Sequence, residues 1–158
     1  MTREDREIDK LIDEMIVREE FSMAIYGFYV HAVVPCEHHP NDTYNVHTHG
    51  LDKTRNHRDL QIVLPIAPSL AHKLIWDIVN LIDNKGFKCV PGKRCSELLE
   101  GMDVEFMLTQ EDGRDVIRIL LPDKNGKLPS DKDCDEAFRH QTSIDTDECH
   151  KNPNRLLN

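Results

Sequence analysis

Residues 44–66 read YNVHTHGLDKTRNHRDLQIVLPI, and this stretch decides the expected fold class. Its first six residues suit a short strand, and apolar residues recur at every second position over residues 60–66. A polar segment that breaks both patterns separates the two. We therefore predict two strands with a polar connection, which places His47 and His49 on the first strand and His57 just before the second.

The segment before this stretch predicts another strand. Residues 28–34 are rich in aromatic and β-branched residues, and Pro35 ends the run because proline donates no hydrogen bond to a neighbouring strand. The turn-forming residues 36–43 then suit a hairpin loop. If the two strands pair symmetrically about this loop, His31 lies opposite His47 on the same face of the sheet.

Two other segments of the sequence have apolar residues along one face of a helix. Two short segments on either side of a glycine alternate between apolar and polar residues. The predicted elements are a helix from Thr2 to Ile25 ended by Gly27, a helix from Pro68 to Gly86, a short helical turn at 96–101, and strands at 103–109 and 115–121. With short connections, these elements predict an α+β fold: a mostly antiparallel sheet of about five strands with two main helices packed on it.

The length of 158 residues is that of one domain. We expect a single α+β domain over residues 1–140. Residues 141–158 lack periodic apolar positions, which predicts a loosely ordered C-terminal tail.

The net charge of -9 disfavours nucleic acid and anionic membranes as partners, because both bind clustered Lys and Arg. No apolar run reaches the roughly 20 residues of a membrane helix, and the first residues are charged, unlike a signal peptide. Five cysteines, an odd number without a CxxC pair, favour reduced thiols. We expect a cytoplasmic protein whose partner is a small molecule or another protein.

Five segments together resemble one known family. They are HTHGL (47–51), NHRDLQIVLPI (56–66), SLAHKL (69–74), LLEGMDVEF (98–106) and LLPDKNGKLP (120–129). In order and spacing they resemble the family catalogued as domain of unknown function 4262, over about residues 27–141. The resemblance implies a shared fold and carries no established reaction, cofactor or substrate.

The chain matches the family pattern at some positions and departs from it at others. The matching residues are Thr48, Gly50, Leu51, His57, Asp59, Leu60, Ala71, His72, Pro122, Asp123, Gly126 and Pro129. His47 and His49 stand where the pattern has an aromatic and an aliphatic residue, and Asn56 and Arg58 replace Gly and Pro around His57. An activity built on His47 and His49 would therefore belong to a subgroup of the family.

The histidines predict a metal site. In an extended strand His47 and His49 project from one face about 7 Å apart, and His31 joins them if the hairpin register holds. His57 could fold back as a fourth ligand. Three or four imidazoles suit a divalent metal such as zinc or iron.

Two further residues are candidates for catalysis. Asp59 could act as a base toward a metal-bound water or orient the metal ligands, as in a metal-dependent hydrolase. His72, in the first turn of the second helix, matches the family pattern and is the other candidate.

Two alternatives to an enzyme remain open. The histidines could instead satisfy hydrogen bonds at strand edges and turns, or line a metal-free pocket. The net charge and the lack of a complete catalytic set also suit a non-catalytic acidic protein-interaction or immunity-type module that neutralises a basic partner. The sequence predicts neither the reaction nor the oligomeric state.

Overall fold

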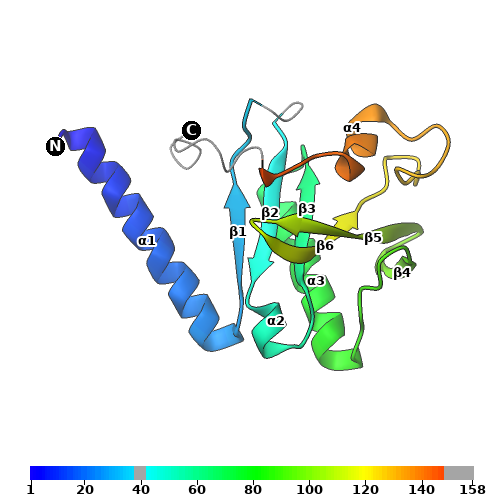
Figure 1. Cartoon of the computed structure of the whole chain (residues 1–158), viewed down its shortest axis with the longest axis horizontal. Coiled ribbons are helices and arrows are strands. Elements are labelled where there is room, and N and C mark those ends of the chain that lie inside the picture. Colours follow the sequence, from blue (N-terminus) through cyan, green and yellow to red (C-terminus); the bar gives the residue numbers. More distant parts are fainter. Residues whose placement is uncertain (38–41, 148–158) are drawn as a thin grey trace.

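The computed structural model describes residues 1–37 and 42–147 and has an α+β architecture (Figure 1). The helices are α1 (Arg3–Tyr26), α2 (Leu51–Thr54), α3 (Pro68–Lys85), α4 (Glu136–Arg139) and the 3-10 helix η1 (His140–Thr142). The strands are β1 (Tyr29–Val33), β2 (Tyr44–His49), β3 (Asp59–Leu64), β4 (Arg94–Leu99), β5 (Met102–Glu111) and β6 (Arg114–Leu120).

The strands form one mixed, mostly antiparallel sheet in the order β1-β2-β3-β6-β5-β4. Only the pairing of β3 with β6 is parallel among the described strands. In the β1–β2 hairpin His31 pairs with His47, as the symmetric register predicts. The next pairs are His47 with Gln61 and Gln61 with Arg118, so one row of polar residues crosses four strands.

The sheet has six strands, one more than predicted, because β4 forms where the sequence suggested a helical turn. Cys95 pairs with Val104 and Leu99 pairs with Met102, and Gly101 supplies the left-handed conformation of the tight turn between the two strands, at φ 73°. Pairing with β5 and burial of Cys95 therefore outweigh the local helical preference of this short segment.

Helix α3 covers one face of the sheet and forms the core with it. Pro68 begins the helix, and Gly86 ends it at φ 62°, as predicted. Its buried stripe packs against apolar residues that alternate with the polar row, among them Val46, Leu60 and Ile117. The apolar and polar faces of the central strands therefore point in opposite directions.

Helix α1 differs from the prediction that two helices pack on the sheet. It has the predicted capping box between Thr2 and Asp5 and ends at Gly27, yet none of its residues, all of which are described, is buried. It leans away from the edge strand β1 (Figure 1). Its C-terminal end is held where Thr54 Oγ1 donates to Gly27 O at 2.9 Å.

The described part of the C-terminal tail is packed, unlike the loose tail expected. Arg118 Nη1 donates to Gln141 O at 2.7 Å and to Ile144 O at 2.9 Å, and both Gln141 and Thr146 are buried. Residues 140–147 thus form a strap over the polar face of the sheet (Figure 1). The remainder of the predicted tail, 148–158, lies outside the described residues.

Two sequence-based expectations concern the cellular environment. Cys89, Cys95 and Cys134 carry free, buried thiols, whereas Cys36 is disulfide-bonded, so reduced thiols were predicted correctly for only part of the set. Within residues 1–37 and 42–147, no helix has the length and apolar character needed to cross a bilayer.

Candidate metal centre

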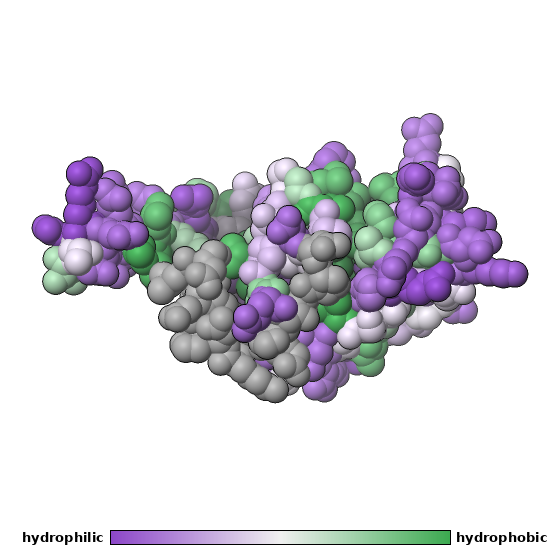
Figure 2. Space-filling model, turned by 90° about the horizontal axis from the view of Figure 1, so that it is seen from above, coloured by the Kyte–Doolittle hydropathy of each residue, from purple (hydrophilic) through white to green (hydrophobic). Residues whose placement is uncertain are grey.

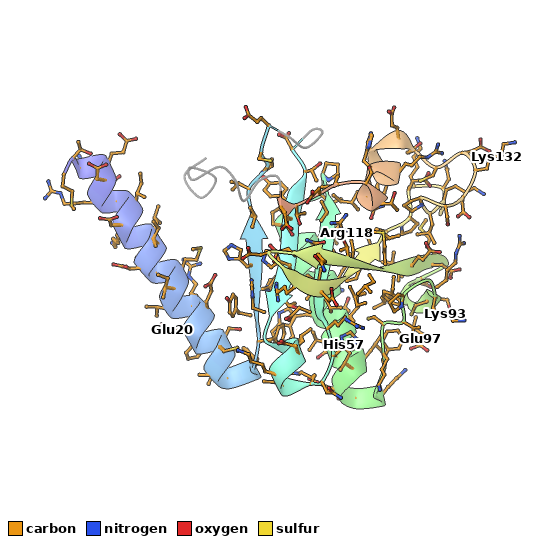
Figure 3. All side chains as sticks on the ribbon, viewed as in Figure 1. Glu20, His57, Lys93, Glu97, Arg118 and Lys132 are labelled. Atoms are coloured by element: carbon orange, nitrogen blue, oxygen red, sulfur yellow. The ribbon has the colours of Figure 1, made fainter. Side chains whose placement is uncertain are left out.

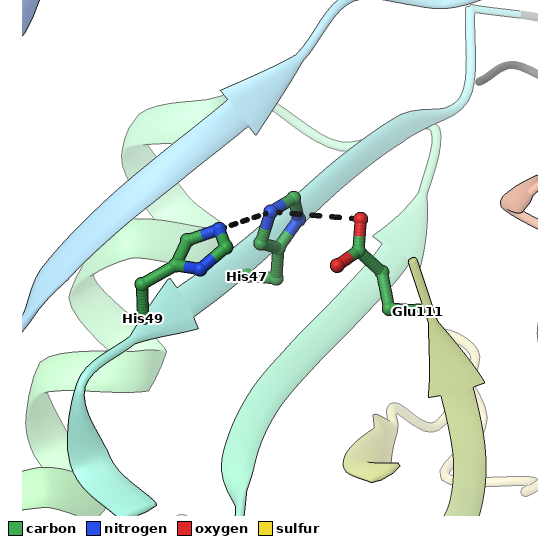
Figure 4. A group of neighbouring side chains, drawn as sticks. All are labelled: His47, His49 and Glu111. Atoms are coloured by element: carbon green, nitrogen blue, oxygen red, sulfur yellow. Dashed lines mark hydrogen bonds and ion pairs between the residues drawn. The ribbon is translucent and has the colours of Figure 1, made fainter. Parts of the chain in front are cut away.

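Three ligand-type side chains converge beside β2. His47 Nε2 lies 3.1 Å from His49 Nε2 and 3.7 Å from Glu111 Oε1 (Figure 4). All three ligand atoms lie within 4.8 Å of one another. His47 and Glu111 are 2% and 1% exposed, while His49 is half-buried. The group is therefore closed on one side and approachable from the side of His49.

The tip of the β5–β6 hairpin brings Glu111 to the histidines. Arg114, which pairs with Glu111 across the tip, donates to Glu111 Oε2 at 3.3 Å and to Thr48 O of β2 at 2.8 Å. Its Nη1 also donates to Asp59 Oδ2 at 2.7 Å. Arg114 therefore fastens the hairpin tip to β2 and β3 and fixes the position of Glu111.

Burial sets the charge states of the group. It lowers the pKa of His49 to about 4, helped by the nearby charge of Arg114 and by His31, so His49 is neutral near pH 7. Burial also raises the pKa of Glu111, against the opposing effect of Arg114. A neutral imidazole is the form that binds a metal, because its second nitrogen then carries a free lone pair.

His31, predicted as a ligand, lies beside the group and is not part of it. Its ring centroid is 5.4 Å from that of His47 and 6.3 Å from that of His49. Its Nδ1 instead forms a hydrogen bond with Glu19 Oε1 of α1 at 2.9 Å. The structure thus places His31 between the three ligand-type side chains and α1.

His57, predicted as a fourth ligand, lies elsewhere. Its Nδ1 is bonded to Arg58 O at 2.7 Å, and its Nε2 accepts from the backbone N–H of Cys89 at 3.1 Å. Figure 3 shows His57 at the α2 end of the sheet, well apart from Arg118. Both ring nitrogens of His57 are hydrogen-bonded to backbone groups, so His57 links the connection before β3 to the segment before β4. The prediction of His57 as a fourth ligand is therefore corrected.

Asp59, the predicted base, is committed to hydrogen bonds. Its Oδ1 accepts from Thr48 Oγ1 at 2.7 Å and from the N–H of Leu51 at 3.0 Å, and its Oδ2 accepts from Arg114. It is 3% exposed. This geometry suits the other predicted role, that of a residue that orients the site, better than that of a free base.

His72, the other catalytic candidate, lines a groove between α1 and β1. The groove has a volume of about 380 Å³ and is also lined by Glu19, Tyr29 and His31. His72 is near Trp76, with ring centroids 6.5 Å apart, and it is not among the residues that converge with His47.

Sequence reasoning missed Glu111, because its approach depends on how the hairpin tip crosses β2 and not on any local pattern. It also missed a signal that was readable. Polar residues occupy alternate positions inside apolar strands: Asn45 and His47 in β2, Gln61 in β3 and Arg118 in β6. Such alternation on buried strands indicates a covered polar face.

Two of the three ligand-atom separations are close to those of a metal site. Two ligands at about 2.0–2.1 Å from an ion lie roughly 2.9–3.4 Å apart for right-angle to tetrahedral geometry. The 3.1 Å between the two imidazole nitrogens falls in this range, and the carboxylate at 3.7 Å is slightly farther away. Two imidazoles with one carboxylate match the donor sets of zinc and non-haem iron sites.

Comparison with known proteins identifies one relationship. The model of a family described as domain of unknown function (DUF4262) matches residues 22–135, which include His47, His49 and Glu111. No curated protein and no solved structure matches the chain.

Proposed function

The chain belongs to the DUF4262 family, and we propose that this member binds a divalent metal, zinc or iron, through His47, His49 and Glu111. The observation that carries the proposal is the 3.1 Å separation of two imidazole nitrogens beside a buried carboxylate. Nitrogens this close need a proton or a cation between them. The N–H of a neutral His49 can fill this position in the metal-free protein, and a bound cation would replace that proton.

Three protein ligands leave at least one coordination position for water or substrate. A water bound there would lose a proton near neutral pH, which suits a metal-dependent hydrolase acting on a small molecule. Arg114, with its side chain 27% exposed and Nη2 3.5 Å from His49 Nε2, would stabilise negative charge that develops beside the metal. Asp59 would hold Arg114 in place.

The groove between α1 and β1 offers a route for that small molecule. Its volume of about 380 Å³ lies within the usual range for small-ligand sites. Two of its lining residues touch the site: Tyr29 stacks on His49 with ring centroids 5.0 Å apart, and His31 lies against His47. A ligand in the groove would therefore reach the site from the side of His49.

Metal analysis of untagged protein tests the proposal. Elemental analysis after purification without chelators is expected to show about one zinc or iron per chain, since residues 1–37 and 42–147 contain one three-ligand group. Metal-stripped protein should recover the same stoichiometry when titrated with Co²⁺, whose visible spectrum reports the ligand geometry. Protein that is folded, metal-free and unable to bind Co²⁺ would overturn the proposal.

A second candidate function is the acidic interaction module, and α1 supplies the observation that favours it. Apolar side chains on this helix are exposed, with Val17 at 62%, Phe21 at 63% and Ile25 at 59%. They share one stripe because they are four residues apart. Figure 2 shows green hydrophobic side chains among purple hydrophilic ones along α1, at the left. An apolar stripe on a protein of net charge -9 suits a partner with an apolar groove and a basic rim.

A pull-down compares the two candidates. The module predicts a stoichiometric partner that is released by salt and is lost in a Phe21→Glu variant, with Glu20→Gln, also on α1, as the control. Recovery of metal-loaded protein without such a partner would count against it. The predicted cytoplasmic location stays a prediction, and the disulfide at Cys36 is a feature that reducing compartments rarely preserve.

A further inference from the structure

A continuous chain of buried polar side chains leads from β6 to the candidate metal centre. Arg118, Gln61, Asn45 and His47 are 1%, 0%, 5% and 2% exposed. Arg118 Nε donates to Gln61 Oε1 at 2.8 Å, and Gln61 Nε2 donates to Asn45 Oδ1 at 3.1 Å. The last contact joins Asn45 Oδ1 to His47 Nδ1 at 3.0 Å.

The chemistry of arginine fixes the direction of every hydrogen bond in this chain. A guanidinium has donors only, so the atom of Gln61 that faces Arg118 must be the carbonyl oxygen. The other end of Gln61 is then its NH₂ group, which donates, and the atom of Asn45 that receives it must be an oxygen. Because that oxygen is an acceptor, His47 must donate to it, and the proton of His47 sits on Nδ1.

This direction determines what His47 presents to the site. A neutral imidazole with its proton on Nδ1 carries a free lone pair on Nε2. His47 Nε2 is the atom that lies 3.1 Å from His49 Nε2 and 3.7 Å from Glu111 Oε1. The lone pair is thus held on the atom that faces the other two ligands.

The start of the chain is held by the strap over the polar face of the sheet. Arg118 Nη1 donates to Gln141 O and Ile144 O, and Gln61 Nε2 also lies 3.4 Å from Thr146 Oγ1. These contacts aim the Nε of Arg118 at Gln61. Residues 140–147 lie beyond the family match at 22–135, and they therefore contribute to the arrangement of His47 from outside the matched region.

We propose that Arg118, Gln61 and Asn45 are positioning residues that lock His47 as the Nδ1-protonated tautomer and so keep its Nε2 ready to bind a cation. The proposed tautomer of His47 is inferred from the hydrogen bonds alone. The proposed effect on metal binding rests on the proposed function. In metal sites, outer partners that orient a histidine in this way typically change affinity by about 10- to 100-fold.

Two nearly isosteric substitutions give opposite expectations. In Gln61→Glu the new carboxylate at position 61 can only accept hydrogen bonds. Asn45 therefore turns its NH₂ group toward this carboxylate and toward His47. Because His47 Nδ1 must then accept, the proton of His47 moves to Nε2. In Asn45→Asp the carboxylate still accepts from Gln61 and from His47, so the Nδ1 proton stays. Each variant changes one buried amide to a carboxylate. Each variant therefore serves as the folding control for the other.

The test is ¹⁵N NMR of the imidazole nitrogens in full-length, metal-free protein, followed by Co²⁺ titration. We expect Nδ1–H at His47 in the wild type and in Asn45→Asp, Nε2–H in Gln61→Glu, and a 10- to 100-fold loss of Co²⁺ affinity in Gln61→Glu alone. Nε2–H in the wild type, or an unchanged tautomer in folded Gln61→Glu, would overturn the inference. If the wild type shows Nδ1–H and binds no Co²⁺, the tautomer lock is supported and only the proposed function fails.

Discussion

Replacing His49 with alanine is expected to weaken Co²⁺ binding by more than about 100-fold, because loss of a direct ligand costs more than loss of an outer partner, which already costs about 10- to 100-fold. The remaining pair, His47 and Glu111, would leave a two-ligand site with little preference for transition metals. The binding constant comes from titration of metal-free protein followed by the visible absorption of Co²⁺.

His31→Ala is the matched control for this experiment. His31 is a histidine of the neighbouring strand whose ring centroid is only 5.4 Å from that of His47, yet its Nδ1 is bonded to Glu19. We expect a change of less than about 10-fold in Co²⁺ affinity, since the ring is no ligand. Equal losses in the two variants would show that His31 coordinates the ion, and no loss in His49→Ala would remove the site as described.

The hairpin around His47 shows which parts of the fold can be predicted from sequence. Strand length, the turn residues and Pro35 predicted the pairing of β1 with β2 and the register that sets His31 opposite His47. The pairing follows from the local composition of the two strands, and the register follows from assuming symmetric pairing across residues 34–43, which the structure has. The strand Arg94–Leu99 was not predictable in this way, because its strand conformation comes from pairing with β5.

The residues of the candidate site also differ in whether local sequence predicts their positions. The two-residue spacing of His47 and His49 placed them on one face from sequence alone, because a strand has a period of two. Glu111 joins them across a hairpin tip held by Arg114, a tertiary arrangement without a local signal. His57 was misassigned because a histidine in a polar connection can use its nitrogens for backbone groups as readily as for a metal.

The positions that match the family have structural roles around the site. Thr48 Oγ1 donates to Asp59 and accepts from the N–H of Leu60. Gly50 adopts φ 111°, and a Cβ at this position would lie 2.7 Å from Gly27 O. His57 joins two connections. His47 and His49, which we expect to differ from the family pattern, carry the proposed chemistry. Loss of the two histidines should therefore remove metal binding and leave the common fold intact.

Asp59→Ala is expected to lower the free energy of unfolding by about 2 to 4 kcal/mol. The substitution removes the acceptor for the hydroxyl of Thr48 and the N–H of Leu51, both buried, and each unsatisfied buried group costs about 1–3 kcal/mol. It also leaves Arg114 without its closest carboxylate. Loss of one partner from a fully buried ion pair costs about 3–5 kcal/mol, and the partial exposure of Arg114 reduces that contribution.

Urea denaturation followed by far-UV circular dichroism measures this change, with Asp115→Ala as the control. Asp115 is an exposed carboxylate on the same strand as Arg114 and accepts one hydrogen bond, from Gln110 at 3.3 Å, so its loss should stay within about 0.5 kcal/mol. A stable Asp59→Ala protein would mean that Arg114 and the hairpin tip hold Glu111 without this carboxylate. That outcome would contradict the structural role that its three hydrogen bonds give Asp59.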